Sequence, residues 1–195
     1  MPEDPAMGSG GRGRILAIDD DGLIGKVIVA ILGGDCDVTI TQSGEAGLHA
    51  AFEDGPFDLV LLDVDMAGMD GHDVCRLMRR DPRTASIPII FLTARVSAEE
   101  EELGLGLGAV DYIAKPISPP ILAARVKTHL ELKSARDRLA GQNRLLEEKV
   151  RTRTRELELT QEVAILTLAT LAETRDNETG MHIQRTRNYV RILAK

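Results

Sequence analysis

Acidic residues follow two segments that are expected to be buried strands. One apolar stretch ends in Asp63, and an earlier one ends in three consecutive acids, Asp19, Asp20 and Asp21. The carboxyl ends of neighbouring parallel strands meet at one edge of a sheet, so these carboxylates are expected to converge there. Unpaired carboxylates at close range repel one another, and a hard divalent cation with oxygen ligands resolves that repulsion. The pattern therefore predicts a Mg²⁺ site.

A hydroxyl group and an ammonium group are expected at the same edge. The stretch before Thr93 is strand-like and apolar, and another strand-like stretch is followed by Lys115 and Pro116. A carboxylate beside a metal, a hydroxyl and a Lys charge is the set that phosphoryl transfer to an aspartate needs, because the metal and the Lys neutralise the transferred oxygens. Asp63 would be the acceptor.

The elements that must position these residues alternate between strand and helix. Short apolar runs with strand character are separated by segments with helical periodicity. This alternation predicts an α/β fold with a doubly wound five-stranded parallel sheet covered on both faces, followed by a long helical extension. The expected strands are 14–19, 37–41, 57–63, 87–93 and 109–114, and the expected helices are 23–34, 44–53, 71–80, 97–107 and one from about 119.

The bulk composition excludes several classes of function. The chain has 195 residues, 43% hydrophobic and 28% charged, as globular proteins do. With 3% aromatic residues, no Trp and a formal net charge of −7, we expect no nucleic-acid partner. No stretch is apolar enough for a membrane span or an export signal, so we expect a cytoplasmic protein with no membrane partner. Side chains expected only to pack or to face solvent are Cys36, Cys75, His49, His72 and His129.

The order of the segments predicts four parts. Residues 1–12 are rich in Pro and Gly and are expected to form a disordered leader, 13–130 a compact domain, 131–159 a helical linker and 160–195 the start of a further domain. Apolar residues in the linker fall near the a and d positions of a heptad, with Asn143 and Arg153 interrupting them. The linker is either a solvated connector helix or a parallel dimeric coiled coil, with a seam at Leu139, Leu146, Val150 and Leu157.

Residues of about 13–130 resemble the receiver domain of two-component response regulators. The resemblance rests on four motifs, each at the carboxyl end of an expected strand: "ILAIDDD", "LLDVDMAGMDG", "FLTA" and "DYIAKP". It implies a phosphorelay in which a partner histidine kinase supplies the phosphoryl group to Asp63. It also implies that Mg²⁺ is held by Asp19, Asp20, Asp63 and the main-chain carbonyl of Asp65. Thr93 would contact the phosphoryl group, Lys115 would pair with it, and Tyr112 would be an aromatic switch that follows Thr93.

Two positions depart from the usual receiver pattern. Asp65 stands where the family usually has a neutral or apolar residue, and Ala67 stands where it usually has Pro. A carboxylate two residues past the acceptor either repels the phosphoryl group or orients a hydrolytic water. We therefore hypothesise an altered lifetime of the phosphorylated state.

Residues 160–195 resemble the opening of the HD-GYP domain, a cyclic di-GMP phosphodiesterase that is often fused to receivers. The stretch "LAETRDNETGMHIQRTRNYVRILA" carries this resemblance. Glu178 and His182 are four residues apart, on one face of a helix, as the first metal ligands of such domains are. The family's remaining ligands, which complete a site for two or three metals, would follow Lys195.

Other interpretations of this segment remain open. "HIQRTR" is similar to the phosphorylated His box of histidine-kinase dimerisation helices, although the acid after the His and the Pro after the Thr are absent. His182 could also be an exposed residue without a role. For the whole protein, one hypothesis is a longer parent, a phosphodiesterase gated by its receiver. The alternative is a complete chain that acts only as a phosphorylation-controlled binding or dimerisation module.

Overall fold

The computed structural model describes residues 12–94, 104 and 106–175. Most of the leader expected at 1–12 and most of the helix expected at 97–107 lie outside the described residues. So do Glu178 and His182. Within the described part, the order of elements is the expected alternation of strands and helices. The elements are β1 Gly13–Ile18, α1 Gly22–Leu32, β2 Cys36–Thr41, α2 Gly44–Glu53, β3 Leu59–Asp63, α3 Gly71–Arg80, β4 Ile89–Thr93, β5 Asp111–Ala114 and α5 Pro119–Arg175.

The five strands form one parallel sheet in the order β2-β1-β3-β4-β5. This order confirms the doubly wound fold with a long helical extension. It changes direction at β1, which lies between β2 and β3, and ligands of such sheets bind outside the carboxyl ends of the strands near this point. Residues in β3 and β4 are buried along their whole length, as strands covered on both faces must be.

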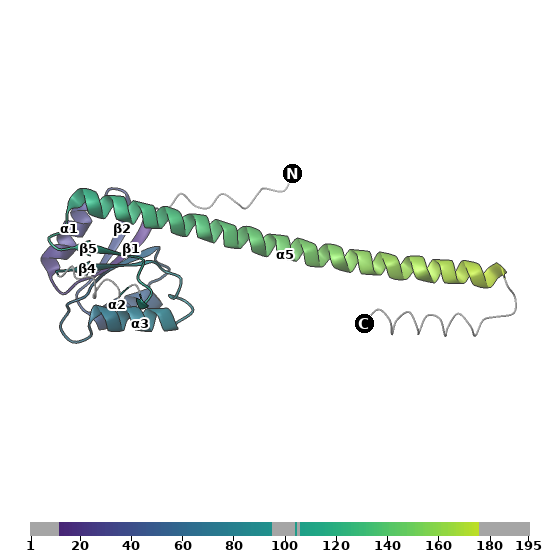
Figure 1. Cartoon of the computed structure of the whole chain (residues 1–195), viewed down its shortest axis with the longest axis horizontal. Helices are drawn as coiled ribbons and strands as arrows, with labels where there is room; N and C mark the ends of the chain where they lie inside the picture. The colour runs from purple at the N-terminus through teal and green to yellow at the C-terminus, as the bar shows by residue number, and fades with distance from the viewer. Residues whose placement is uncertain (1–11, 95–103, 105, 176–195) are drawn as a thin grey trace. The chain divides into compact units, whose positions relative to one another are not determined.

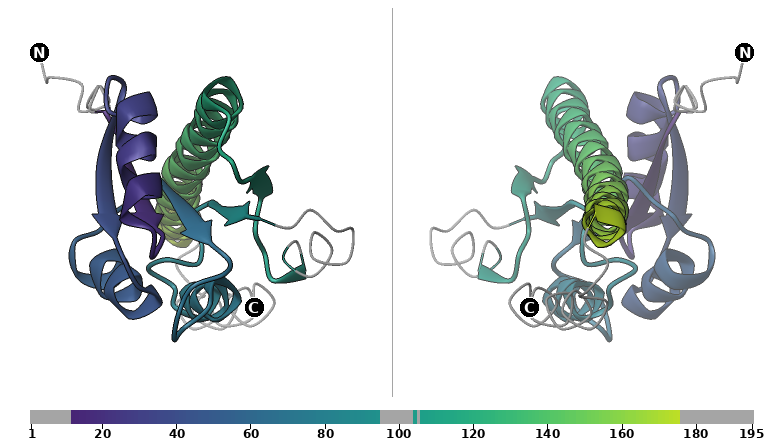
Figure 2. Two further views of the ribbon diagram at one scale, coloured as in Figure 1. Left: turned by 90° about the vertical axis from the view of Figure 1, so that its left-hand side faces the viewer. Right: turned by 90° about the vertical axis from the view of Figure 1, so that its right-hand side faces the viewer.

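Two apolar layers cover the two faces of the sheet, which lies between α1 and α5 on one side and α2 and α3 on the other (Figures 1 and 2). Alternate strand residues point into each layer because side chains alternate along a strand. Leu16 and Leu62 pack with the α2 and α3 residues Leu48 and Met78. The opposite layer contains Ile15, Ala17, Leu59 and Leu61 from the strands, Ile28 from α1, and Leu122 and Val126 from α5.

Polar side chains cap three of the helices that follow the strands. Asp21 accepts a hydrogen bond from Leu23 N–H at the start of α1, Ser43 accepts one from Ala46 N–H in α2, and Asp70 accepts one from Asp73 N–H in α3. Each cap satisfies a backbone donor that the first helical turn leaves without a partner. These caps set where α1 and α3 begin, and both helices begin close to the acidic edge of the sheet.

Helix α5 continues through both expected domain boundaries, at 130 and at 159, without a break. The compact unit that contains the sheet ends at Asp137, and a second unit begins at Arg138. Two side chains near the end of the first unit tie α5 to loops of that unit: Lys133 contacts Asp58, and Arg136 donates to the carbonyl of Ser86. The expected domain boundaries stay predictions.

Candidate phosphoryl and metal site

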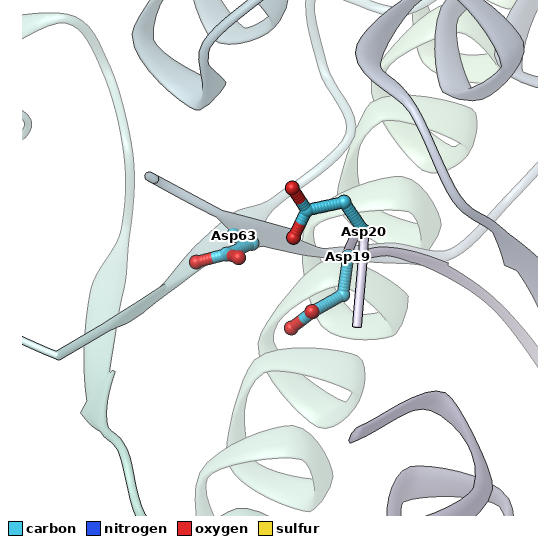
Figure 3. Close-up of side chains that lie close together, drawn as sticks. All are labelled: Asp19, Asp20 and Asp63. Atoms are coloured by element: carbon cyan, nitrogen blue, oxygen red, sulfur yellow. The ribbon is translucent and has the colours of Figure 1, made fainter. Parts of the chain in front are cut away.

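Three carboxylates lie together at the carboxyl edge of the sheet, next to the point where the strand order changes direction. Asp19 and Asp20 follow β1, and Asp63 is the last residue of β3 (Figure 3). One carboxylate oxygen from each of the three lies within 4.8 Å of the others. The sequence predicted this cluster, because β1 and β3 pair in parallel and therefore end at the same edge.

Lys115 forms ion pairs with two of these carboxylates. Its Nζ lies 2.8 Å from Oδ2 of Asp19 and 2.8 Å from Oδ2 of Asp63. The main chain of Lys115 is also held, because its N–H donates to the carbonyl of Thr93 at 2.8 Å. β4 and the residue after β5 thus position the ammonium group over the ends of β1 and β3.

Burial makes this cluster electrostatically strained. Asp19 is fully buried and Asp63 is 3% exposed. Burial raises the pKa of Asp63, and the charge of Asp19 raises it further, while Lys115 acts in the opposite direction. Burial alone would lower the pKa of Lys115, but its two carboxylate partners outweigh that effect and the net direction is upward. The ammonium group is therefore held in its charged form.

The donor set fits a hard divalent cation. Three carboxylates and one ammonium leave an excess of two negative charges when all are ionised. Oδ2 of Asp19 is buried and accepts no hydrogen bond of good geometry from the described residues, so its contact with Lys115 is ionic only. An oxygen-rich, negatively charged cluster with a buried oxygen that accepts no hydrogen bond is the environment that Mg²⁺ occupies in proteins.

The loop between β3 and α3 closes over the acids through main-chain groups. Asp65 N–H donates to Oδ1 of Asp63 at 3.3 Å, and Ala67 N–H donates to Oδ2 of Asp20 at 3.1 Å. The second bond exists because position 67 is not Pro, which has no N–H. Sequence reasoning noted the substitution but missed this bond, since nothing in the motif indicates where the loop amide points.

Gly71 is the first residue of α3 and packs directly against the end of β3, the strand that carries Asp63. A Cβ at this position would lie 2.2 Å from the carbonyl oxygen of Asp63 and 2.9 Å from Cα of Val64. Gly71 N–H donates to the carbonyl of Val64 at 3.0 Å. A larger residue would push the helix away from the acid cluster, so the glycine next to the acidic loop is part of the site.

Thr93 and Tyr112 lie on the neighbouring strands as expected. Thr93 ends β4 and is 5% exposed. Tyr112 in β5 is paired in register with Phe91, and the two ring centroids are 5.7 Å apart. Asp65, the unusual residue past the acceptor, has an exposed side chain. The structure thus brings every expected receiver residue to one edge or to the strand pair beside it.

The remaining His and Cys residues have packing or surface positions. Cys36 and Cys75 are buried free thiols, and burial raises the pKa of both. His49 is exposed, His72 packs edge-on against Phe91, and His129 Nε2 lies 3.1 Å from Oδ2 of Asp111. None of them lies in the acidic cluster formed by Asp19, Asp20 and Asp63.

Comparison with known proteins agrees with this geometry. Residues 15–127 match the response regulator receiver domain. The chain belongs to the receiver-domain family of response regulators. Receiver domains of this family act in two-component phosphorelays and interact with histidine kinases.

Individual relatives extend the picture. The chain is 49% identical over 158 residues to a "Probable cyclic di-GMP phosphodiesterase" of Vibrio cholerae, which covers 81% of this chain and 36% of the relative. A response regulator from Chloroflexus aurantiacus has a similar structure, with a TM-score of 0.58, 34% identity, and coverage of 61% of this chain and 98% of that one. The "BeF3 Activated DrrB Receiver Domain" matches with a TM-score of 0.54, 34% identity, and coverage of 61% and 97%.

The aligned part of this chain spans 36% of the length of the curated relative from Vibrio cholerae. The alignment of 158 residues is longer than the receiver match at 15–127, so the likeness continues into α5 or beyond. Across residues 12–94, 104 and 106–175, the structure contains no helix with the length and apolar character of a membrane span.

Proposed function

We propose that this receiver accepts a phosphoryl group on Asp63. The observation that carries the proposal is the position of Lys115 Nζ, 2.8 Å from both Asp63 and Asp19, with Asp20 in the same cluster. A carboxylate with a fixed cation on one side and metal-ligating acids on the other is prepared for attack on a phosphorus atom.

The reaction is a displacement at phosphorus. A carboxylate oxygen of Asp63 forms a bond to phosphorus while the bond to the donor breaks, a P–N bond for a phosphohistidine or a P–O bond for acetyl phosphate. The donor leaves with the bonding electron pair. Lys115 and the hydroxyl of Thr93 contact the oxygens of the transferred group, where negative charge must be compensated. Asp19, Asp20, Asp63 and the main-chain carbonyl of Asp65 would hold Mg²⁺, which supplies further charge neutralisation.

Labelling with acetyl phosphate tests the acceptor. Wild type incubated with acetyl phosphate and Mg²⁺ is expected to gain the mass of one phosphoryl group, and Asp63→Asn is expected to gain none. Asp58→Asn is a matched control. Asp58 directly precedes β3, and it also pairs with a lysine, Lys133. Equal labelling of Asp63→Asn and wild type would remove Asp63 from this role.

We propose that phosphorylation moves a two-state element beside the site. Thr93 approaches the phosphoryl group, and the ring of Tyr112 follows into the space that Thr93 leaves. Tyr112 is half-buried and packs on Phe91, which lies in β4 two residues before Thr93. The change then passes through β5 to α5, to which Asp111 is joined by an ion pair with Arg125 and a hydrogen bond with His129.

Asp65 is proposed to change the lifetime of the phosphorylated state. Its side chain is exposed two residues after the acceptor, where it can reach the phosphoryl group or the water that hydrolyses it. The dephosphorylation rate of Asp65→Asn, measured after removal of free acetyl phosphate, is expected to differ from that of wild type. Equal rates would discard the idea.

For the output we propose a cyclic di-GMP phosphodiesterase in a longer parent protein. The 49% identity to the Vibrio cholerae relative and the pair Glu178 and His182 support this proposal. The intact mass of the protein purified from its own organism tests it. A mass well above 21.2 kDa, with hydrolysis of cyclic di-GMP that is lost in His182→Ala, is the expected result. A mass near 21.2 kDa would favour a phosphorylation-controlled binding module instead.

We propose two partners, a cognate histidine kinase and a second copy of this chain. The support for a dimer is a row of exposed apolar side chains on α5, since Leu139, Leu146, Val150 and Leu157 are each more than half exposed. A parallel coiled coil would bury them. Sedimentation of wild type is expected to show a dimer, and Val150→Lys is expected to show a monomer, whereas Arg151→Ala, off the seam, is expected to stay dimeric.

A further inference from the structure

The segment that leads into β5 contains a buried glycine, Gly104, against the aromatic side chain of Tyr112. The carbonyl of Gly104 accepts hydrogen bonds from Leu107 N–H and Ala109 N–H, both at 3.1 Å. A Cβ built on Gly104 would lie 2.1 Å from the hydroxyl oxygen of Tyr112 and 2.9 Å from Cε2 of Phe91. The Tyr112 hydroxyl therefore fills the space that any side chain at position 104 would need.

Backbone conformation does not explain this glycine. Residue 104 is helical, and positive φ angles among the described glycines occur at Gly68 and Gly108, not at Gly104. Alanine is favoured over glycine in a helix, so local propensity argues against glycine here. The space taken by Tyr112 is the feature that requires it. Gly106, two residues on, differs, because a Cβ there would meet no described atom within 4 Å.

Of the two rings beside Gly104, Tyr112 is the one able to move. Phe91 is fully buried in β4, and the edge of His72 packs on it with ring centroids 5.3 Å apart. Tyr112 is only half-buried and packs against the apolar layer that contains Phe91. A methyl group at position 104 would therefore displace the ring of Tyr112 rather than that of Phe91.

We propose that Gly104 is a positioning residue for the receiver switch. The Tyr112 hydroxyl occupies the space that a side chain at position 104 would take, and we call this space the seat. The inference rests on the proposed phosphorylation of Asp63 and on the movement of Tyr112 with Thr93. If occupancy of the seat differs between the two states of the switch, a substitution that blocks it changes the affinity of the Asp63 site for a phosphoryl group by the same factor, since linkage is reciprocal.

Beryllofluoride, which mimics a phosphoryl group on a carboxylate, provides the test. Affinity is measured in the presence of Mg²⁺ for wild type, Gly104→Ala and the matched control Gly106→Ala. Tyr112 is followed by its fluorescence in a Tyr189→Phe background, because Tyr112 and Tyr189 are the two tyrosines of the chain and there is no Trp. We expect Gly104→Ala to change both the affinity, by about fivefold or more, and the emission of Tyr112. Gly106→Ala is expected to stay within about twofold of wild type, below the usual range of allosteric coupling.

A double-mutant cycle separates the seat from a general effect on folding. In a Tyr112→Ala background no ring occupies the seat, so Gly104→Ala should no longer alter the affinity. If Gly104→Ala does not fold by itself, Gly104→Ala with Tyr112→Ala is expected to regain folding, because it lacks the ring whose hydroxyl and Cζ would lie 2.1 Å and 3.0 Å from the new Cβ. Persistence of misfolding in that double variant would overturn the inference.

The outcomes distinguish this inference from the proposed function. Absence of Mg²⁺-dependent beryllofluoride binding in wild type would contradict the proposed function of Asp63. Normal binding in wild type with unchanged affinity and unchanged Tyr112 emission in Gly104→Ala would overturn the role of Gly104 alone. The same holds for a change of affinity that persists in the Tyr112→Ala background.

Discussion

Two lysines in this receiver each bridge two aspartates, at opposite edges of the sheet. Lys115 pairs with Asp19 and Asp63 at the carboxyl edge, each at 2.8 Å. Lys133 of α5 pairs with Asp58 at 3.2 Å and with Asp137 at 2.7 Å. Asp58 directly precedes β3, so this second trio lies at the amino edge. The two lysine side chains are equally exposed, at 18%.

The difference lies in the carboxylates. Those of Asp19 and Asp63 are 0% and 4% exposed, whereas those of Asp58 and Asp137 are 40% and 52% exposed. Water solvates the second pair, so that trio is an ordinary surface interaction. The first pair has no such solvation, and Lys115 is the cation that compensates its charge among the described residues. Identical residue types thus form a buried charge cluster in one place and a solvated surface tie in the other.

The largest difference is expected in phosphorylation. Lys115→Met should lower the initial rate of labelling by acetyl phosphate by about 10²-fold or more, because a preorganised charge on the transferred oxygens is lost. Lys133→Met should label within about twofold of wild type, as a residue outside the site does. Initial rates by intact mass measure both. A comparable loss in the two variants would mean that the trios do not differ in function.

The second largest difference between Lys115→Met and Lys133→Met is expected in the free energy of unfolding. Lys115→Met leaves two buried carboxylates without their cation and is expected to lower the free energy of unfolding by about 3 kcal/mol. Lys133→Met removes an interaction with solvated partners and should lower it by at most about 1 kcal/mol. Urea unfolding measures these values, and added Mg²⁺ should recover part of the first loss only. A larger loss for Lys133→Met would contradict the comparison.

The contribution of Asp63 to stability should decrease as pH rises, because burial raises its pKa in the folded protein. The pKa of Asp63 is raised in the folded protein, so the unfolded chain releases this proton first as pH increases. Its contribution to stability therefore falls from about pH 4 upward, through its raised folded pKa. At neutral pH, Asp63→Asn should raise the melting temperature by about 2–4 °C, while Asp58→Asn should not raise it. A lower melting temperature for Asp63→Asn would show that Lys115 more than compensates the burial.

The smallest difference between the two lysines is expected in how salt changes their coupling to the aspartates. Raising NaCl from about 0.1 M to about 1 M shortens the Debye length from about 10 Å to about 3 Å. The coupling between Lys133 and Asp58, measured by a double-mutant cycle, should fall by a few tenths of a kcal/mol, as exposed pairs do. The coupling between Lys115 and Asp63 should stay nearly constant, because its carboxylate is shielded from solvent ions. Equal salt sensitivity would remove burial as the distinguishing feature.

Sequence reasoning predicted the carboxyl-edge trio and missed the one at the amino edge. Asp63 and Lys115 each follow a recognisable strand, and the ends of parallel strands have a common edge, so their meeting follows from topology. Lys133 and Asp58 are 75 residues apart and belong to no motif. Their contact depends on how α5 packs along the compact unit, which extends to Asp137.

The amino-acid sequence by itself determined the order of strands and helices, the parallel sheet and the set of residues at its carboxyl edge. These depend on periodicity and on the alternation of elements, which are local properties of the chain. Only the tertiary structure decided which carboxylates lost their water, that Ala67 N–H reaches Asp20, and that the Tyr112 hydroxyl occupies the space beside Gly104. Burial and distances of a few ångström arise from the packing of segments far apart in the sequence, and no local pattern encodes them.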